Sequence, residues 1–593
     1  MIASCLLRAG ARSPGIRARP KSLRFHSSGA SPPAPAAAAV NDVTETNFST
    51  ALTELRRLVR DADFVSIDLE MTGVTSAPWR EALEFDRSDI QYLKIKDSAE
   101  RFSVVQFGVC PFRWDTHSHC FVAHPYNFYL FPRQEVSIDG FWNDFLCQTS
   151  SLEFLAKHQF DFNTCIYKGI SYLSRSQELE ALNKFPDSSP TPSGTTTMDT
   201  MQSTRMSDIL FVERMKNTID EWLVELRVVV KHFRDLCYVH GGNAETSSVP
   251  HPLIVYTDSV TDRDLLMREV KALQREKHEL KVKAAIGFRH VIDLLSSEKK
   301  LIVGHNCFLD WAHVYRKFFG PLPPTVEEFA SELQAYFPHI IDTKVMLNSD
   351  DALLHTVGRA GTSLSKAFSR LCSPASGRIN GLLVKVEVQV DDRRVSNWNS
   401  GSKHEAGYDA FMTGSVFSQA CLHLGIDLGM DSVDLRRNEK LGKYLNLLYL
   451  SWANGDVVDL KTGRATAAKS RYPKDRDFSK MVVLWGEPSR LKTKDIRECF
   501  SKTFGTSAVT SARHLDETAA LVQFSGEELV EKFLEWKDAL RRDGGGPISS
   551  LHPLTRIFDG GTVRAGTYET YKEICSSPVS EFLFSDQAEA AGR

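Results

Sequence analysis

The sequence predicts an α/β protein, in which a mixed sheet flanked by helices is interrupted by an insertion and followed by a smaller α+β domain. Short apolar segments at 64–71 and 301–304 have the character of buried strands, and a helical pattern follows the second. A stretch rich in Pro, Ser, Thr and Gly from 185 to 208 interrupts this pattern. At 593 residues, with 42% hydrophobic and 25% charged side chains, the chain is long enough for two or three domains.

Two acids mark the first strand. In Phe64-Val-Ser-Ile-Asp-Leu-Glu-Met-Thr-Gly73, Asp68 and Glu70 lie two residues apart. Because successive strand side chains alternate between faces, both carboxylates project to the same side. Neighbouring carboxylates repel each other, and a hard divalent cation such as Mg²⁺ relieves that repulsion. The alternative is an acidic edge strand with one solvated face.

Further acids follow in two later segments. Leu301-Ile-Val-Gly-His-Asn-Cys-Phe-Leu-Asp310 is a short apolar run, a turn, and then Asp310 at the start of a helical pattern. His404-Glu-Ala-Gly-Tyr-Asp409 opens an apolar stretch that predicts a helix to residue 424. Five residues of ideal helix would place His404 and Asp409 on different faces, so a shared site requires a bend, which Gly407 permits. Alternatively, Asp310 is a first-turn charge and His404 a capping or surface residue.

Together, these motifs resemble the CAF1-type DEDD 3′-exoribonucleases of the histidine subclass, and among them the poly(A)-specific ribonucleases. The order of the motifs is Asp-x-Glu, then Asp after Gly-His-Asn, then His-x-x-x-x-Asp. The local sequence similarity extends over roughly residues 60–430. The segments that carry it are Ser66–Gly73, Phe102–Gly108, Asn127–Pro132, Gly304–Asn306, Phe337–Lys344 and His404–Gly414. The resemblance implies an RNase H-like nuclease core, a helical insertion and a C-terminal domain like an RNA recognition motif (RRM).

The resemblance also implies the chemistry of the site. Asp68, Glu70, Asp310 and Asp409 would hold two Mg²⁺ ions, with Mn²⁺ as the alternative, and His404 would be the general base. No small-molecule cofactor is expected. The products would be 5′-AMP units released singly from the 3′ end of a poly(A) tail. Met71, Val74 and Lys344 match substrate-contacting positions, whereas the alternative for Lys344 is a surface lysine. The motif does not assign Asp342 to the metals.

The domain boundaries follow from these matches. We expect the nuclease core at 42–180 and 286–430, with a flexible loop and a helical insertion between them at 181–285. Within the insertion, apolar spacing predicts one or two helices over 209–240, and alternating charge predicts another over 263–283. The resemblance implies a nucleic-acid-binding module here, and packing or interaction is the alternative.

A second domain is expected at 476–542. Its predicted elements are strand 481–485, helix 493–504, strands 507–515 and 518–524, and helix 526–540. In an RRM, sheet aromatics stack on bases. Ala519 and Leu521 stand where the motif has aromatics, and Arg513 and His514 stand near the place of the tryptophan with which the resembled family can stack on an mRNA cap. The alternative role is packing against the nuclease or support of a dimer. Residues 543–593 are expected to form a tail.

The first 41 residues differ in composition from the rest. They contain six basic residues, no acid, and a Pro/Ala-rich stretch, which predicts a mitochondrial transit peptide. The alternatives are a chloroplast signal or a disordered basic arm of a nuclear or cytoplasmic protein. Loss of the six basic residues would change the formal net charge from −3 to −9. Binding of RNA must then rest on local basic groups and on the metal ions.

The remaining composition limits the partners. No apolar run reaches about 18 residues, so no membrane interaction is expected. Eleven cysteines without paired spacing favour a reducing compartment. The resemblance implies a homodimer that binds RNA. We therefore expect a Mg²⁺-dependent deadenylase. The alternatives are an enzyme that trims small non-coding RNAs, which would shorten other tails equally fast, and a non-catalytic RNA-binding scaffold, which would bind no metal.

Overall fold

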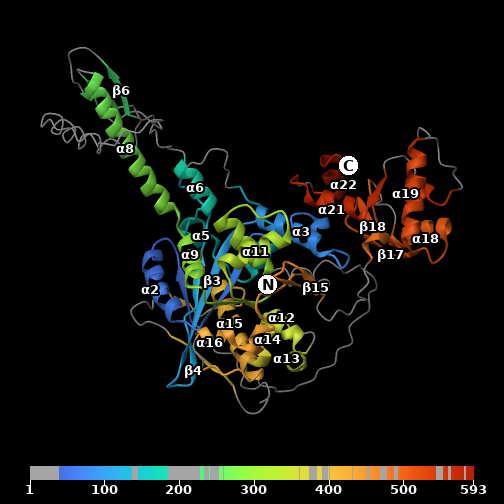
Figure 1. Cartoon of the computed structure of the whole chain (residues 1–593), viewed down its shortest axis with the longest axis horizontal. Helices are drawn as coiled ribbons and strands as arrows, with labels where there is room; N and C mark the ends of the chain where they lie inside the picture. The colour runs from blue at the N-terminus through green and yellow to red at the C-terminus, as the bar shows by residue number, and fades with distance from the viewer. Residues whose placement is uncertain are drawn as a thin grey trace, which may run out of the picture. The chain divides into compact units, whose positions relative to one another are not determined.

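The computed structural model shows two compact units (Figure 1). Unit 1 comprises Met1–Arg133, Trp142–Tyr172 and Phe288–Arg593, and unit 2 comprises Gln134–Phe141 and Leu173–Gly287. The structure describes residues 39–136, 144–183, 228–232, 239–240, 253–257, 260–358, 361–372, 383–389, 398–399, 401, 403–429, 432–450, 455–467, 477–486, 492–542, 552–558, 563–579 and 582–593. The predicted leader, except for residues 39–41, and the 185–208 loop lie outside these residues.

The core of unit 1 is a mixed nine-stranded sheet with the main order β10-β9-β2-β3-β5-β1-β12, while β4 joins β11 to β3. β2 is parallel to β9 and antiparallel to β3, and β9 is parallel to β10. This arrangement confirms the α/β class with a mixed sheet. The strands are β1 (Val40–Val43), β2 (Phe64–Met71), β3 (Val104–Asp115), β4 (Cys120–Ala123), β5 (Tyr126–Tyr129), β9 (Leu301–Gly304), β10 (Ile340–Asp342), β11 (Lys385–Val388) and β12 (Trp398–Asn399).

Helices contribute to two apolar clusters that also take side chains from the sheet. One cluster joins β2 to α2 (Phe48–Asp61), α3 (Ser88–Arg101), α9 (Arg289–Glu298), α10 (Phe308–Val314) and α11 (Val326–Tyr336). The other contains α12 (Thr343–Ser349), α13 (Asp351–Val357), α14 (Leu364–Leu371), α15 (Ala406–His423), α16 (Ser432–Arg437) and α17 (Glu439–Gly442). The remaining core elements are α4 (Thr149–Lys157), α5 (Phe162–Lys168) and a small sheet, β13 (Leu447–Tyr449), β14 (Asp456–Asp459) and β15 (Ala465–Ala467).

Strand β2 is buried along its whole length. Ile67 and Leu69 pack into the first apolar cluster. On the opposite face, Ser66 Oγ donates a hydrogen bond of 2.6 Å to the carbonyl oxygen of Ala410 in α15. Asp68 and Glu70 share this second face because of the strand's period of two. The edge-strand alternative is therefore wrong, and both acids face the helix that carries Asp409.

In unit 2, the prediction of one or two helices over 209–240 is wrong for the part of that segment that the structure describes. Residues 228–232 and 239–240, expected to be helical, form strands β6 (Val228–His232) and β7 (Val239–His240). With β8 (Leu253–Thr257) they make a three-stranded sheet in the order β6-β8-β7. The run of β-branched valines at 228–230 favours a strand over a helix. The predicted helix at 263–283 is confirmed as α8 (Val260–Ala285), and α6 (Arg175–Asn183) also belongs to this unit.

The C-terminal domain has the predicted strands and helices and one further strand. β16 (Met481–Trp485), α18 (Thr493–Phe504), β17 (Val509–His514), β18 (Ala519–Phe524) and α19 (Glu527–Arg542) match the expected pieces. The sheet order is β17-β18-β16-β19, and β19 (Arg564–Thr567) comes from the segment expected to be a tail. That boundary was placed too early. The helices α20 (Thr555–Phe558), α21 (Tyr568–Ser576) and α22 (Phe584–Ala590) follow α19.

One face of this small sheet is covered by the chain itself. Ala519 and Leu521 pack in a single apolar cluster with Trp79 and Ile90, which come from the nuclease core, and with Tyr571 of α21. Arg513 is also engaged, because its Nη2 lies 3.1 Å from Glu84 Oε2. A face buried in this way cannot stack on RNA bases without rearrangement.

Two compositional expectations concern the whole chain. Among the residues with assigned positions, no helix combines the length and the apolar character needed to cross a bilayer. The cysteines of the same segments are all free thiols.

Candidate active site

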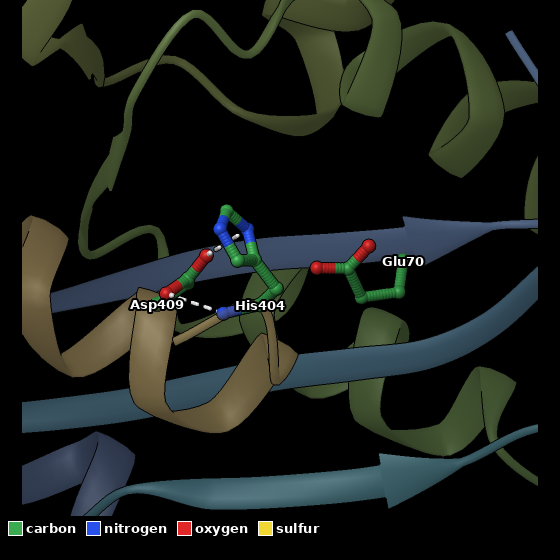
Figure 2. A group of neighbouring side chains, drawn as sticks. All are labelled: Glu70, His404 and Asp409. Atoms are coloured by element: carbon green, nitrogen blue, oxygen red, sulfur yellow. Dashed lines mark hydrogen bonds and ion pairs between the residues drawn. The ribbon is translucent and has the colours of Figure 1, made fainter. Parts of the chain in front are cut away.

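Glu70, His404 and Asp409 converge at the beginning of α15 (Figure 2). One side-chain oxygen or nitrogen from each lies within 4.8 Å of the others. Glu70 comes from β2, Asp409 from the first turn of α15, and His404 from the residues just before that helix (Figure 2). The structure therefore brings together three of the five residues expected to be catalytic within contact distance of a single ion.

The geometry of His404 differs from the predicted bend at Gly407. Helix α15 begins at Ala406, and His404 precedes it with a left-handed φ of 69°. This turn places the His404 backbone N–H 3.3 Å from Asp409 Oδ1, to which it donates, and His404 Nδ1 4.0 Å from Asp409 Oδ2. Gly407 serves close packing instead, since an added Cβ would lie 2.8 Å from the Cβ of Asn127.

Two amides and a glycine of the sheet fix where α15 begins. Gln106 Oε1 accepts from the Ala406 N–H, and Asn127 Oδ1 accepts from the Gly407 N–H, both at 3.2 Å. Gly108 lies opposite Asp68 in the β2–β3 pair, and a Cβ there would stand 1.9 Å from the Ala406 carbonyl oxygen. These residues lie in the segments 102–108 and 127–132, whose similarity to the family was noted, but their positioning role was not foreseen.

The carboxylates of the site are buried, and several of their oxygens lack a hydrogen-bond partner among the described residues. Asp68 Oδ2, both oxygens of Glu70, Asp310 Oδ1 and Asp409 Oδ2 are buried without a hydrogen-bond partner in the part of the chain that the structure describes. Burial, with the charge of Asp409, raises the pKa values of Asp68 and Glu70 well above their ordinary range. Burial also raises the pKa of Asp310 to about 6 and that of Asp409 to about 7.

Asp68 and Asp310 belong to the same electrostatic cluster. The charges of Asp409, Asp310 and Glu70 all contribute to the raised pKa of Asp68. Asp310 lies in the first turn of α10, as predicted. A fifth nearby acid, Asp342, has a different role, because its carboxylate accepts from the backbone N–H groups of Asn306, Cys307, Lys344 and Tyr449. These hydrogen bonds link the turn before Asp310 to the segments that contain Lys344 and Tyr449.

Two aromatic rings pack beside His404. The ring centroids of Phe154 and His158 lie 4.7 Å and 4.2 Å from that of His404. Burial, together with the neighbouring His158 and Lys403, lowers the pKa of His404 to about 4. The neutral imidazole is therefore the stable form at neutral pH, and a neutral imidazole can accept a proton.

The predicted substrate residues lie at the edges of the site. Met71 ends β2 and is 3% exposed. The Val74 N–H donates to Gln148 Oε1 at 3.0 Å, and Val74 lines a cavity of about 400 Å³. Lys344 is not a free surface lysine, since its Nζ donates to the Thr362 carbonyl oxygen at 3.0 Å, and burial lowers its pKa.

Comparison with known proteins agrees with this geometry. Residues 43–417 match the CAF1 family ribonuclease domain, and residues 475–590 match the RNA-recognition domain of poly(A)-specific ribonuclease PARN. The second match extends past residue 542, in keeping with the placement of β19.

Three relatives illustrate the range of similarity. The poly(A)-specific ribonuclease PARN of Arabidopsis thaliana is 48% identical, with 94% of this chain and 89% of that protein covered. The PARN of Homo sapiens is 27% identical over 83% of this chain and 77% of its own length. The pre-piRNA 3′-exonuclease trimmer of Bombyx mori is 27% identical, with 63% and 70% covered. The chain therefore belongs to the CAF1 ribonuclease family and, within it, to the poly(A)-specific ribonucleases.

Proposed function

We propose that this protein is a divalent-metal-dependent 3′-to-5′ exoribonuclease that shortens poly(A) tails and releases 5′-AMP. The observation that carries the proposal is the cluster of four buried carboxylates, Asp68, Glu70, Asp310 and Asp409, which have oxygens without a partner among the described residues and lie beside a neutral histidine. Buried acids without partners destabilise a fold unless a cation or proton neutralises them.

The donor set fits hard divalent cations. All four side chains offer carboxylate oxygens, which suit Mg²⁺ or Mn²⁺, and the set is large enough to hold two ions. When bound, such ions supply a Lewis acid for the scissile phosphate and lower the pKa of a coordinated water. The protein's own contribution is to hold the four acids in fixed positions on β2, α10 and α15.

His404 is the proposed general base. Its imidazole is neutral at neutral pH and adjoins the acid cluster, so it can take a proton from the attacking water. Asp409 accepts from the backbone N–H of His404 and thereby holds the residue in its left-handed turn. Phe154 and His158 pack beside the ring.

Met71, Val74 and Lys344 are proposed substrate contacts. Val74 lines a cavity, and Lys344 lies with its Nζ 5.8 Å from the ring centroid of Tyr449, which lines the same cavity.

The test is a shortening assay with RNAs labelled at the 5′ end and terminated by adenylate or by mixed sequence. Stepwise loss of the adenylate tail that slows at its end, and that requires Mg²⁺ and Asp68, is the expected result. EDTA and Asp68→Ala serve as controls. Binding without shortening would instead support the scaffold alternative.

Trimming of small non-coding RNAs is the second candidate, because the relative from Bombyx mori is named for such an activity. The same chemistry would serve both functions. Equal rates on adenylate and mixed-sequence ends would favour trimming over deadenylation.

The mitochondrial location and the homodimer are further proposals. The acid-free, Arg-rich leader supports import, which a fusion of residues 1–41 to a fluorescent protein would test, with its Arg residues changed to Ala as the control. Light scattering of the purified chain would test the dimer. A mass of 66.6 kDa in solution would contradict it.

A further inference from the structure

The loop between β2 and α3, residues 72–87, joins the proposed active site to the C-terminal domain. It begins two positions after Glu70 and includes Val74, a proposed substrate contact. Three residues after Val74, Ala77 is buried in the apolar cluster that the nuclease core shares with the C-terminal domain. Three residues of chain span at most about 10 Å, so the position of Val74 depends on how firmly this cluster holds Ala77.

Apolar packing holds the middle of this loop. Trp79 is fully buried, and its ring centroid lies 5.3 Å from that of Phe584 in α22, in an edge-to-face arrangement. The same cluster contains Tyr571 of α21 and Leu521 of β18. An aromatic ring of this size buries a large apolar area, and separation of the C-terminal domain would expose it to water. Docking of that domain therefore stabilises the loop in its observed position.

Two tyrosines of α21 donate hydrogen bonds to the end of the loop. Tyr571 Oη donates to Asp86 Oδ1 at 3.0 Å, and Tyr568 Oη donates to the Phe85 carbonyl oxygen at 2.7 Å. Asp86 is fully buried, and its other oxygen accepts from the Leu83 N–H at 2.7 Å within the loop. A buried carboxylate that loses such a donor is costly, so the two tyrosines fix the position of the loop's end.

Two ion pairs flank these tyrosines. Arg87 Nη1 lies 2.7 Å from Glu569 Oε1, and Lys572 Nζ lies 2.9 Å from Asp89 Oδ2. Each pair joins α21 to the loop end or to the start of α3, and each is partly exposed, so its contribution to stability is small. The two pairs have opposite polarity, and this complementarity specifies how the helix docks on the loop.

The catalytic acids are positioned by other contacts. Gln106 and Asn127 fix the beginning of α15. Asp342 accepts from the turn before Asp310. Ser66 bonds β2 to α15. The residues that make these bonds belong to the nuclease core, so loosening of the loop should weaken the contact with substrate and leave the chemical step intact.

We propose that α21 holds the loop at residues 72–87 in the conformation that binds RNA, with Tyr571 and Tyr568 as positioning residues. The C-terminal domain then promotes binding of the poly(A) tail without stacking on bases, in keeping with its covered sheet face. This inference rests on the proposed function, because it takes Val74 as a contact for the RNA 3′ end. Neither tyrosine takes part in hydrolysis.

Tyr571→Phe in the full chain tests the inference, because it removes only the hydroxyl and keeps the ring in the cluster. We expect KM for a labelled oligoadenylate to rise about five- to tenfold, since only molecules with a positioned loop bind well, while kcat stays within about twofold. Tyr568→Phe, which loses the bond to Phe85, should behave in the same way. Titration of the same RNA in the Asp68→Asn background with Mg²⁺ should show a matching rise in Kd.

Tyr444→Phe is the matched control. Tyr444 Oη also donates to a carboxylate, 3.3 Å from Asp350 Oδ2, but both residues belong to the nuclease core. Both variants should lower the melting temperature, whereas only Tyr571→Phe should raise KM. Hydrogen exchange provides a readout that needs no turnover. Peptides from residues 72–87 should exchange faster in Tyr571→Phe and at the wild-type rate in Tyr444→Phe.

Faster exchange of the loop, with weaker RNA binding and unchanged kcat, supports the inference. Unchanged exchange would mean that α21 does not hold the loop, and faster exchange with unchanged binding would mean that the loop does not contact RNA. Either result overturns it, as does a lower kcat at unchanged KM. If the wild-type protein shortened no RNA, the proposed function would be wrong, and the exchange and binding measurements would still decide this inference.

Discussion

His404 Nδ1 lies 4.0 Å from Asp409 Oδ2, although five residues of continuous helix would separate them by more than a full turn. The approach is possible because the helix starts only after His404. α15 begins at Ala406, and the left-handed backbone at His404 turns the imidazole back over the first turn. The same carboxylate therefore adjoins both the acid cluster and the proposed base.

Replacement of His404 should separate catalysis from binding. We expect His404→Ala to lower the rate of the chemical step by about 10²- to 10⁴-fold, the usual contribution of a general base. Affinity for RNA should change little, because His404 is proposed as the base and not as a substrate contact. Single-turnover shortening of an adenylate tail measures the first quantity, and RNA titration of the Asp68→Asn background measures the second.

His158→Ala is the matched control for this variant. His158 lies 4.2 Å from His404, centroid to centroid, but is not part of the acid cluster. It should slow the reaction by only a few-fold. A His404→Ala protein that retains most of the wild-type rate would exclude His404 as the base.

Neutralising one acid should stabilise the metal-free protein. Burial raises the pKa of Asp68, so the folded state holds protons more tightly than the unfolded state, whose carboxylates titrate near their ordinary values. The protonated cluster therefore stabilises the folded state at low pH, and this stabilisation is lost as pH rises through the folded-state pKa values. In EDTA at pH 7.5, Asp68→Asn should increase the free energy of unfolding by about 1 to 3 kcal/mol.

Mg²⁺ should reverse the order of stability, so that the wild-type protein becomes more stable than Asp68→Asn. The wild-type protein gains stability from bound ions, whereas Asp68→Asn has lost a ligand and gains less. Thermal melts with EDTA and with Mg²⁺, at pH 5.5 and 7.5, measure the four combinations. If Asp68→Asn melts below the wild-type protein in EDTA at pH 7.5, the acids do not repel one another as described.

How much of this site was predictable depends on the range of the interactions. The period of two along β2 was sufficient to place Asp68 and Glu70 on one face, since that pattern is local. The start of α15 was not predictable, because Gln106 and Asn127 on two strands determine it through bonds across the sheet. Strand β19 was missed for a similar reason, as its four residues acquire strand character only by pairing with β16.

A buried histidine should make stability depend on acid pH. His313 in α10 is 0% exposed, and both ring nitrogens are unpartnered among the described residues. Burial, then the charge of Lys317, lowers its pKa well below the ordinary value of 6.5. The unfolded state therefore binds a proton that the folded state excludes, and stability falls as pH drops below about 6.5.

His313→Leu should remove that dependence. The stability of the variant relative to the wild-type protein should rise by up to about 1.4 kcal/mol for each pH unit between 6.5 and 5. Urea unfolding at several pH values measures the difference, and the exposed His355 in α13 provides the control substitution His355→Leu. A pH-independent difference would mean that His313 becomes protonated in the folded protein.

Gly108 offers the sharpest test of how the fold positions the site. A Cβ at this position would lie 1.9 Å from the carbonyl oxygen of Ala406, a backbone atom that cannot rotate away. Gly108→Ala must therefore push the start of α15, and with it Asp409, away from β3. We expect a loss of at least about 10²-fold in activity, since misplacement by about 1 Å is enough for such a loss. We also expect destabilisation of about 1 to 3 kcal/mol, typical of overpacking.

Gly442→Ala is the matched control, because a Cβ at that helical glycine would meet nothing within 4 Å. It should keep full activity and be neutral or slightly stabilising, as expected for Gly to Ala in a helix. Shortening assays and thermal melts of both variants give the comparison. If Gly108→Ala were as active as Gly442→Ala, then α15 could shift without moving Asp409, and the link between the glycine and the catalytic geometry would be wrong.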